Sequence, residues 1–332
     1  MAKIVFGAGA SHTPVLALPP EHWEQRAIAD YKNEALTLSN GATLGYRDLL
    51  EITGGKYANE ATIEKFKLKS IACQRHLDRL ADELEAAAPD VVVIVGDDQE
   101  ELFGLDNTPL ISIFYGDQLV MHSEGERGQR KDWEQTLLER YAMDTFHRFP
   151  GQRAVALSLI QGLLDRGVDI GASASVPDAA TAGFGHAYGF IIRRLFKGRQ
   201  IPVVPVLLNT YYPPNVPSSS RCFELGQHLR AAIAELESSL KVAVIASGGL
   251  SHFVVDEKLD HDFLAALSGG DAAALRSVPR TALRSGSSEI LNWIVAAGVL
   301  HGLPIGWAEY VPVYRTAAGT GVGCAFVAWR AA

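Results

Sequence analysis

Short, unbroken runs of apolar and β-branched residues recur along this chain, and stretches long enough for helices separate them. Continuous apolar strands are typical of a sheet that is covered on both faces, as in α/β proteins. The strand-like runs are Ile4–Phe6, Val91–Val95, Leu110–Tyr115, Ile201–Leu208 and Val242–Ala246. The helix-like stretches are Ala61–Ala88, Asp132–Arg148, Val155–Arg166, His186–Phe196 and Arg221–Leu236. The pattern predicts an α/β fold with a mostly parallel central sheet flanked by helices.

The two ends of the chain depart from this pattern. A helix is expected near Ser288–Leu300, followed by two further strands at Ala308–Tyr314 and Gly323–Trp329. Proline and glycine pairs punctuate residues 16–60, which indicates a surface excursion or a lid. Because we find no repeat and no linker-like segment, we predict a single catalytic domain over residues 1–332.

Composition excludes several classes of protein. The net charge is −8 and Lys and Arg do not cluster, so we expect no nucleic-acid partner. The three cysteines, Cys73, Cys222 and Cys324, fit neither a disulfide framework nor a zinc spacing, which favours a reducing compartment. No apolar run approaches the roughly 20 residues of a membrane span, and the first residues lack a basic leader. We therefore expect a soluble cytoplasmic protein with no membrane partner.

Polar side chains follow three of the predicted strands. His12 comes after the first strand, beyond a Gly-Ala-Gly turn, and Asp97-Asp98-Gln99 comes after Val91–Val95. His252 closes a Gly-Gly-Leu-Ser-His sequence after Val242–Ala246. Ligands of α/β proteins bind outside the carboxyl ends of the strands, where these side chains are expected. Each signal alone is weak, because a lone histidine or an acidic turn is as often a solvated loop or a helix cap.

Four further residues are candidates on similar grounds. Glu289 opens an apolar helix after Ser and Gly, where a glutamate usually compensates the helix dipole. His186 also opens a helix, and Asn209 and Tyr211 lie in a proline-rich loop that suits either a pocket wall or a subunit contact. The remaining histidines, His122 among them, have no convergent polar partner in the sequence, and we interpret them as surface or packing residues.

The order of these motifs resembles that of class III extradiol ring-cleavage dioxygenases. The motifs run in the order Ser11-His12-Thr13-Pro14, Asp97-Asp98-Gln99, Gly185-His186, Ile201–Pro214, Gly248-Gly249-Leu250-Ser251-His252 and Gly286-Ser287-Ser288-Glu289. The chain is similar to the LigB-type catalytic subunit of the protocatechuate 4,5-dioxygenase and gallate dioxygenase group. The resemblance runs from residue 1 to about residue 300 and is weakest over residues 16–60.

The resemblance implies roles for these residues. His12 and Glu289 match ligands of an Fe(II) ion, His252 matches the acid/base histidine, and His186 matches a second active-site histidine. The family's other histidine ligand closes an Asn-Asp-His motif, where this chain has Asp97-Asp98-Gln99. Either Gln99 or Asp98 would then supply the missing donor, and either oxygen donor lowers the preference for Fe(II) over other hard divalent metals.

The implied reaction is Fe(II)-dependent extradiol cleavage of a catechol-type aromatic substrate by O₂, with both oxygen atoms incorporated and His252 as acid/base. Asn209 and Tyr211 would contact the substrate. The altered motif leaves two alternatives: a hydrolase, lyase or isomerase without O₂ activation, or a non-catalytic binding protein on the same scaffold. The resemblance also implies a homodimer.

Overall fold

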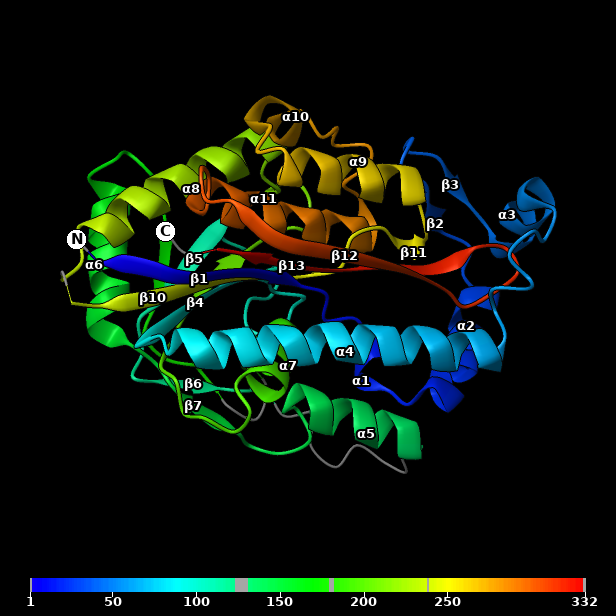
Figure 1. Ribbon diagram of the computed structural model, residues 1–332, viewed down its shortest axis with the longest axis horizontal. Helices are drawn as coiled ribbons and strands as arrows, with labels where there is room; N and C mark the ends of the chain where they lie inside the picture. Colours follow the sequence, from blue (N-terminus) through cyan, green and yellow to red (C-terminus); the bar gives the residue numbers. More distant parts are fainter. Residues whose placement is uncertain (1, 123–130, 179–181, 238, 331–332) are drawn as a thin grey trace.

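A sheet of nine strands forms the centre of the molecule, which we describe from a computed structural model (Figure 1). The structure describes residues 2–122, 131–178, 182–237 and 239–330. The strand order is β11-β13-β1-β10-β4-β9-β5-β8, and β12 pairs with β13 outside this path. The pairs β1–β10, β10–β4 and β4–β9 are parallel, whereas β13 and β5 join this parallel centre in the antiparallel direction. The predicted fold class is confirmed.

The elements have the following bounds. The strands of the central sheet are β1 (Lys3–Ala10), β4 (Val91–Asp97), β5 (Ile111–Phe114), β8 (Gly171–Ser173), β9 (Val203–Leu208), β10 (Lys241–Ser247), β11 (His252–Val254), β12 (Ile305–Tyr314) and β13 (Thr320–Trp329). Two small hairpins pair β2 (Leu36–Thr37) with β3 (Thr43–Leu44) and β6 (Gln118–Val120) with β7 (Arg148–Pro150). The helices are α1 (Pro14–Ala17), α2 (Trp23–Tyr31), α3 (Tyr46–Thr53), α4 (Ile63–Ala87), α5 (Asp132–Tyr141), α6 (Arg153–Leu164), α7 (His186–Leu195), α8 (Ser219–Ala234), α9 (Glu257–Ser268), α10 (Ala272–Arg276) and α11 (Ile290–Val299), with 3-10 turns η1 (Pro20–His22) and η2 (Ser285–Glu289).

Helices cover both faces of the sheet, and one apolar cluster fills each interface. Figure 1 shows α1, α4, α5 and α7 on one side and α8, α9, α10 and α11 on the other. Alternate residues of a strand belong to different clusters, since successive side chains point to opposite faces. In β4, for example, Val92 and Ile94 pack toward α4 and α7, whereas Val93 and Val95 pack toward α8 and α11. The buried apolar runs that identify these strands therefore contribute side chains to two hydrophobic cores, one on each face of the sheet.

Most predicted elements are present, and the differences have local causes. The helix predicted over Asp132–Arg148 ends at Tyr141, because Ala142 has a left-handed backbone with φ 55° and residues 148–150 form strand β7. Residues 16–60 contain helices α2 and α3 and the β2–β3 hairpin. Whether this segment acts as a lid stays a prediction.

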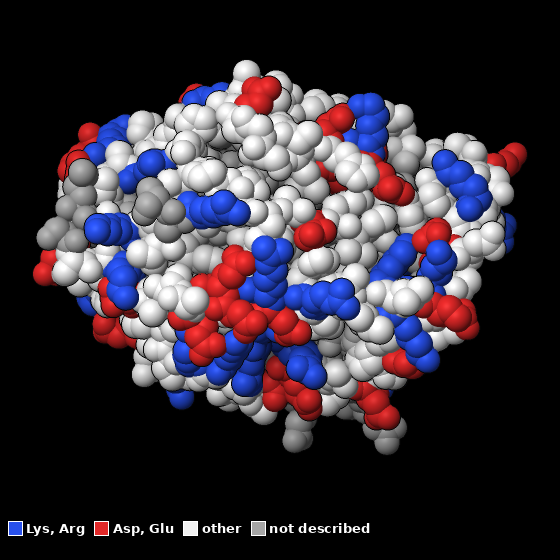
Figure 2. Space-filling model, in the orientation of Figure 1, with Lys and Arg blue, Asp and Glu red and all other residues white. Residues whose placement is uncertain are grey.

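Charged side chains of both signs cover the surface around α4 (Figure 2). Several of them pair between α4 and the end of α7, such as Asp78 with Arg194 and Asp82 with Lys197. This face therefore has no large area of a single sign. None of the helices in the described ranges combines the length and the apolar character that crossing a membrane requires.

Candidate active site

Residues from four separate places in the sequence meet at one edge of the sheet. Strands β1, β10 and β4 are neighbours and parallel, so their carboxyl ends lie side by side. His12 follows β1, Asp97 ends β4, and His252 begins β11 just after the turn that follows β10. Glu289 is the last residue of η2, the short turn that leads into α11. The predicted convergence at the strand ends is therefore present.

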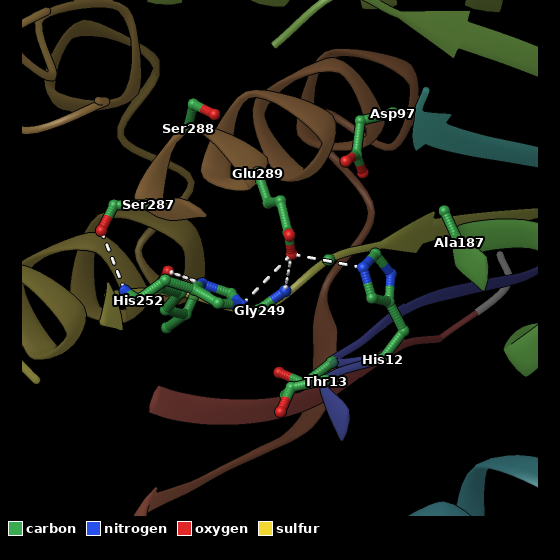
Figure 3. Close-up of polar contacts among 12 residues, drawn as sticks. His12, Thr13, Asp97, Ala187, Gly249, His252, Ser287, Ser288 and Glu289 are labelled. Carbon is green, nitrogen blue, oxygen red and sulfur yellow. Dashed lines mark hydrogen bonds and ion pairs between the residues drawn. The ribbon is translucent and has the colours of Figure 1, made fainter. Parts of the chain in front are cut away.

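Three of these side chains form a group that could hold a metal ion. Donor atoms of His12, Asp97 and Glu289 lie within 4.8 Å of one another, and all three residues are buried. Nε2 of His12 is 3.4 Å from Oε2 of Glu289. Figure 3 shows the His12 ring and the two carboxylates turned toward a common space. One imidazole and two carboxylates are donors that divalent transition metals accept in proteins.

A hydrogen bond at Nδ1 fixes the orientation of the His12 ring. Its Nδ1 lies 2.8 Å from the Ser247 hydroxyl, which in turn lies 2.6 Å from the carbonyl oxygen of Ala187. A carbonyl oxygen only accepts hydrogen bonds, so the Ser247 hydroxyl donates to the carbonyl oxygen of Ala187. Nδ1 of His12 must therefore donate to the Ser247 hydroxyl. The other nitrogen, Nε2, is buried and has no hydrogen-bond partner among the residues that the structure describes. An orphaned imidazole nitrogen of this kind, with its ring held through the opposite nitrogen, is the arrangement found in metal-ligating histidines.

Backbone and amide groups hold the two carboxylates. Asn292 donates to Oδ1 of Asp97 over 3.0 Å, and Gln99 donates to Oδ2 over 2.9 Å. The backbone N–H of Gly249 donates to Oε2 of Glu289 over 2.6 Å. Burial alone would raise the pKa of Glu289, but the neighbouring His252 and His12 lower it to about 2. Burial and the charge of Glu289 raise the pKa of Asp97. A bound divalent cation would offset this concentration of buried negative charge.

His252 and His186 complete the polar part of the site, and they differ in their Nδ1 partners. Nδ1 of His252 donates to the carbonyl oxygen of Leu250 over 2.9 Å, which leaves Nε2 on the cavity side, 3.6 Å from Oε2 of Glu289. Nδ1 of His186 lies 2.6 Å from the carboxylate of Glu101. Burial alone would lower the pKa of His186, but Glu101 raises it to about 9. The contact with Glu101 therefore favours the charged form of His186.

The turn around His252 leaves no space for a larger neighbour. A Cβ atom placed on Gly286 would lie 2.5 Å from Cβ of His252. The backbone N–H of His252 donates to the Ser287 hydroxyl over 2.9 Å, so η2 and the His252 turn are held in contact. These two contacts explain why Gly286 and Ser287 occupy the turn that leads to Glu289.

A cavity of about 540 Å³ opens above these residues, large enough for a substituted aromatic ring. It is lined by His12, Gln99, Glu101, His122, Tyr141, His186, Tyr211, His252, Glu289, Arg26 and Arg315, with apolar wall residues that include Leu137, Leu138 and Met143. The Tyr141 hydroxyl donates to the carbonyl oxygen of His12 over 2.9 Å and so contributes to the position of that residue.

Most of the residues predicted from the sequence line this one cavity, but two do not. His12, Glu289, His252, His186, Gln99 and Tyr211 line it, whereas Asp98 and Asn209 lie elsewhere. The Asp98 carboxylate accepts backbone N–H groups of Leu102 and Phe103 over 2.9 and 3.0 Å, and burial raises its pKa to about 7. The Asn209 amide donates to carbonyl oxygens of Tyr212 and Asn215 and so holds the loop.

Several residues of the site were not predicted from the sequence. Asp97 belongs to the possible metal group although it does not line the cavity, and it could have been found, because side chains alternate along a strand and Asp97 therefore shares a side with Gln99 rather than with Asp98. His122 was interpreted as a surface or packing residue, although it lies in the cavity wall. Arg26 and Arg315 come from segments far from every recognised motif, and no local pattern in the sequence marks them.

The fold and the site define an α/β protein with a buried His-Asp-Glu group beside an aromatic-sized cavity. Residues 60–327 match the family of the catalytic LigB subunit of aromatic ring-opening dioxygenase. Because this match covers most of the chain, the protein belongs to that family. The chain is also similar to gallate dioxygenase of Pseudomonas putida, with 31% identity over 110 residues. That alignment covers 30% of this chain and 32% of the relative, so it spans about a third of the length of that curated protein.

Proposed function

We propose that this protein cleaves a catechol-type aromatic ring by extradiol dioxygenation, using a bound Fe(II) ion and O₂. The observation that carries the proposal is the buried group of His12, Asp97 and Glu289, of which His12 and Glu289 line one cavity together with His252. Family membership supports ring-opening dioxygenation as the class of reaction. The choice of Fe(II) and of a catechol substrate is our own step beyond that membership.

His12 Nε2 and the carboxylates of Asp97 and Glu289 would hold the metal. When bound, Fe(II) supplies a centre at which a diol and O₂ are brought together and exchange electrons. Asp97 stands in for the histidine that the family's motif places two residues further along the chain, and Gln99 supports it through a hydrogen bond of 2.9 Å. A set of three protein donors leaves coordination positions open for substrate, as in two-histidine, one-carboxylate sites.

His252 is suited to take the proton of a phenolic hydroxyl. Its Nδ1–H is held by the Leu250 carbonyl, so the proton is accepted at Nε2, and the carbonyl stabilises the imidazolium that results. His186, kept charged by Glu101, donates a hydrogen bond from the same cavity to an oxygen of the substrate. Tyr211, whose hydroxyl is 3.4 Å from that of Ser285, offers a further polar contact.

The departure at Asp97 and Gln99 favours a second candidate function. Two carboxylates and one imidazole carry more negative charge than the family's ligand set, which suits a hard divalent ion that does no redox chemistry. The same site would then act as a metal-dependent hydrolase, lyase or isomerase, with His252 still as acid/base.

Oxygen consumption separates the two candidates. The protein is purified without oxygen and loaded with Fe(II), its metal content is measured, and O₂ uptake is followed with a panel of catechols. Uptake equal to the amount of ring-opened product supports dioxygenation. Stoichiometric metal with no O₂ uptake on any catechol contradicts it and leaves the second candidate. The exposed-residue variant Asp262→Ala serves as the control for handling, because Asp262 is on the outer side of α9.

A further inference from the structure

Among the described residues, one positively charged side chain of the cavity has no partner of opposite sign. Arg26, on α2, lies in the cavity wall, and within the described residues it forms no hydrogen bond or ion pair. Its Nε atom is buried without an acceptor. Its guanidinium lies 5.9 Å from the centre of the Trp133 ring, which is a weak contact compared with an ion pair. A buried N–H donor without an acceptor is costly, so such a group in a cavity indicates a ligand.

The nearby acid cannot neutralise Arg26, because other donors already occupy it. Asp30 accepts Nε and Nη2 of Arg315 over 2.8 and 3.0 Å. The hydroxyl of Thr320 donates to the same carboxylate over 2.9 Å. The pair of Asp30 and Arg315 is therefore neutral, and the charge of Arg26 remains. Burial and the charge of Arg315 lower the pKa of Arg26, which reflects this lack of compensation.

We propose that Arg26 binds a carboxylate group on the aromatic substrate and thereby determines substrate specificity; this inference rests on the proposed function. The planar guanidinium presents paired N–H donors that match the two oxygens of a carboxylate. A single uncompensated positive charge suits a monoanion better than a doubly charged phosphate. Apolar residues of the same wall, Leu137 and Leu138, would contact the ring between the diol and the carboxylate.

Binding of a matched pair of ligands tests the proposal without any turnover. The probes are 3,4-dihydroxybenzoate and its methyl ester, which keeps the ring and the diol but has no charge. Affinities are measured by calorimetry, without oxygen, on the metal-loaded wild-type protein and on Arg26→Met. We expect the wild type to prefer the carboxylate and Arg26→Met to lose about 10–100-fold in affinity for it, with the ester unchanged, as for a charge-assisted hydrogen-bonded pair.

Two further variants exclude trivial explanations. Arg26→Lys keeps the charge without the planar fork and should retain part of the preference. Arg75→Met, on the exposed side of α4, removes a positive charge of the same type elsewhere and should change neither affinity. The melting temperatures of the variants show whether they are folded.

The outcomes are distinct from those of the oxygen-uptake test. Equal loss for acid and ester in Arg26→Met, no loss for either, or no preference in the wild type overturns the role of Arg26. A selective loss in a protein that consumes no O₂ upholds the carboxylate site and removes the dioxygenase proposal instead.

Discussion

Two groups of charged residues lie at the same cavity, and they are built in opposite ways. His12, Asp97 and Glu289 come from strand ends and a short turn, and hydrogen bonds with Ser247, Gln99, Asn292 and Gly249 fix them before any ligand is present. Arg26 and Arg315 are long side chains from a helix and from the end of a strand hairpin. Only Arg315 is held, by Asp30.

The difference separates two tasks. Side chains that must present several donor atoms to one point need short tethers and supporting hydrogen bonds, because a small displacement would open the group. A side chain that recognises a charged substituent tolerates more freedom, and the ligand itself can order it. The first group is negative and attracts a cation, whereas the second retains a positive charge and attracts an anion.

Removal of a donor from the fixed group should have the largest effect. We expect His12→Ala and Glu289→Ala each to abolish stoichiometric metal binding, since the remaining donors are too few to compete with water. Metal content after dialysis, measured by mass spectrometry, checks this result. Asp262→Ala, which removes an exposed carboxylate, should keep the metal. Full retention of metal in both donor variants would show that His12 and Glu289 are not metal ligands.

Replacement of His252 should separate catalysis from metal binding. His252→Phe should lower kcat by about 10²–10⁴-fold, the usual contribution of a positioned acid/base. Its metal content should stay at the wild-type level, because His252 holds its proton through Leu250 and is not among the three donors. Loss of the metal together with activity would show that His252 is itself a ligand.

The group of fixed donors was largely predictable from the sequence, and the two arginines were not. His12, Glu289 and His252 follow recognisable strand or turn patterns, and local rules place them at one edge of a parallel sheet. Asp97 was not predicted, because the comparison with the family's Asn-Asp-His motif pointed to its neighbours, Asp98 and Gln99, as the missing donor. The position of Arg26 depends on how α2 packs against the rest of the chain, which no local pattern records. Similarly, helix α5 ends at Tyr141 where a residue with positive φ interrupts it, and alanine gives no sign of that.

The pair of Asp30 and Arg315 should be important for stability. Asp30→Asn leaves Arg315 buried with its charge uncompensated, and we expect the free energy of unfolding to fall by about 3–5 kcal/mol. Urea denaturation measures the change as a lower midpoint with an unchanged slope. Asp78→Asn breaks a matched pair with Arg194 at the surface, where Asp78 is 67% exposed, and should cost less than about 1 kcal/mol. Equal effects of the two variants would mean that burial of the Asp30–Arg315 pair does not increase its contribution to the free energy of unfolding.

The smallest expected effect distinguishes two neighbouring acids. Asp97 faces His12 and Glu289, whereas Asp98 accepts the backbone N–H groups of Leu102 and Phe103. Asp97→Asn should therefore weaken binding of the metal by at least about 10–100-fold, the scale seen even for outer residues of metal sites.

Asp98→Asn is the matched control, because it makes the same chemical change one residue away. It should leave metal affinity within about threefold of the wild type and lower stability by about 1 kcal/mol, since the amide replaces one of the two accepting oxygens with an NH₂ group, which cannot accept an N–H. Titration of each apo variant with Fe(II) or Mn(II) without oxygen gives the affinities. A larger loss for Asp98→Asn than for Asp97→Asn would show that the turn rearranges on metal binding and that Asp98 is the third donor. Equal, small losses would mean that neither carboxylate is a ligand, and the amide of Gln99, which faces the same cavity, would then be the donor to test.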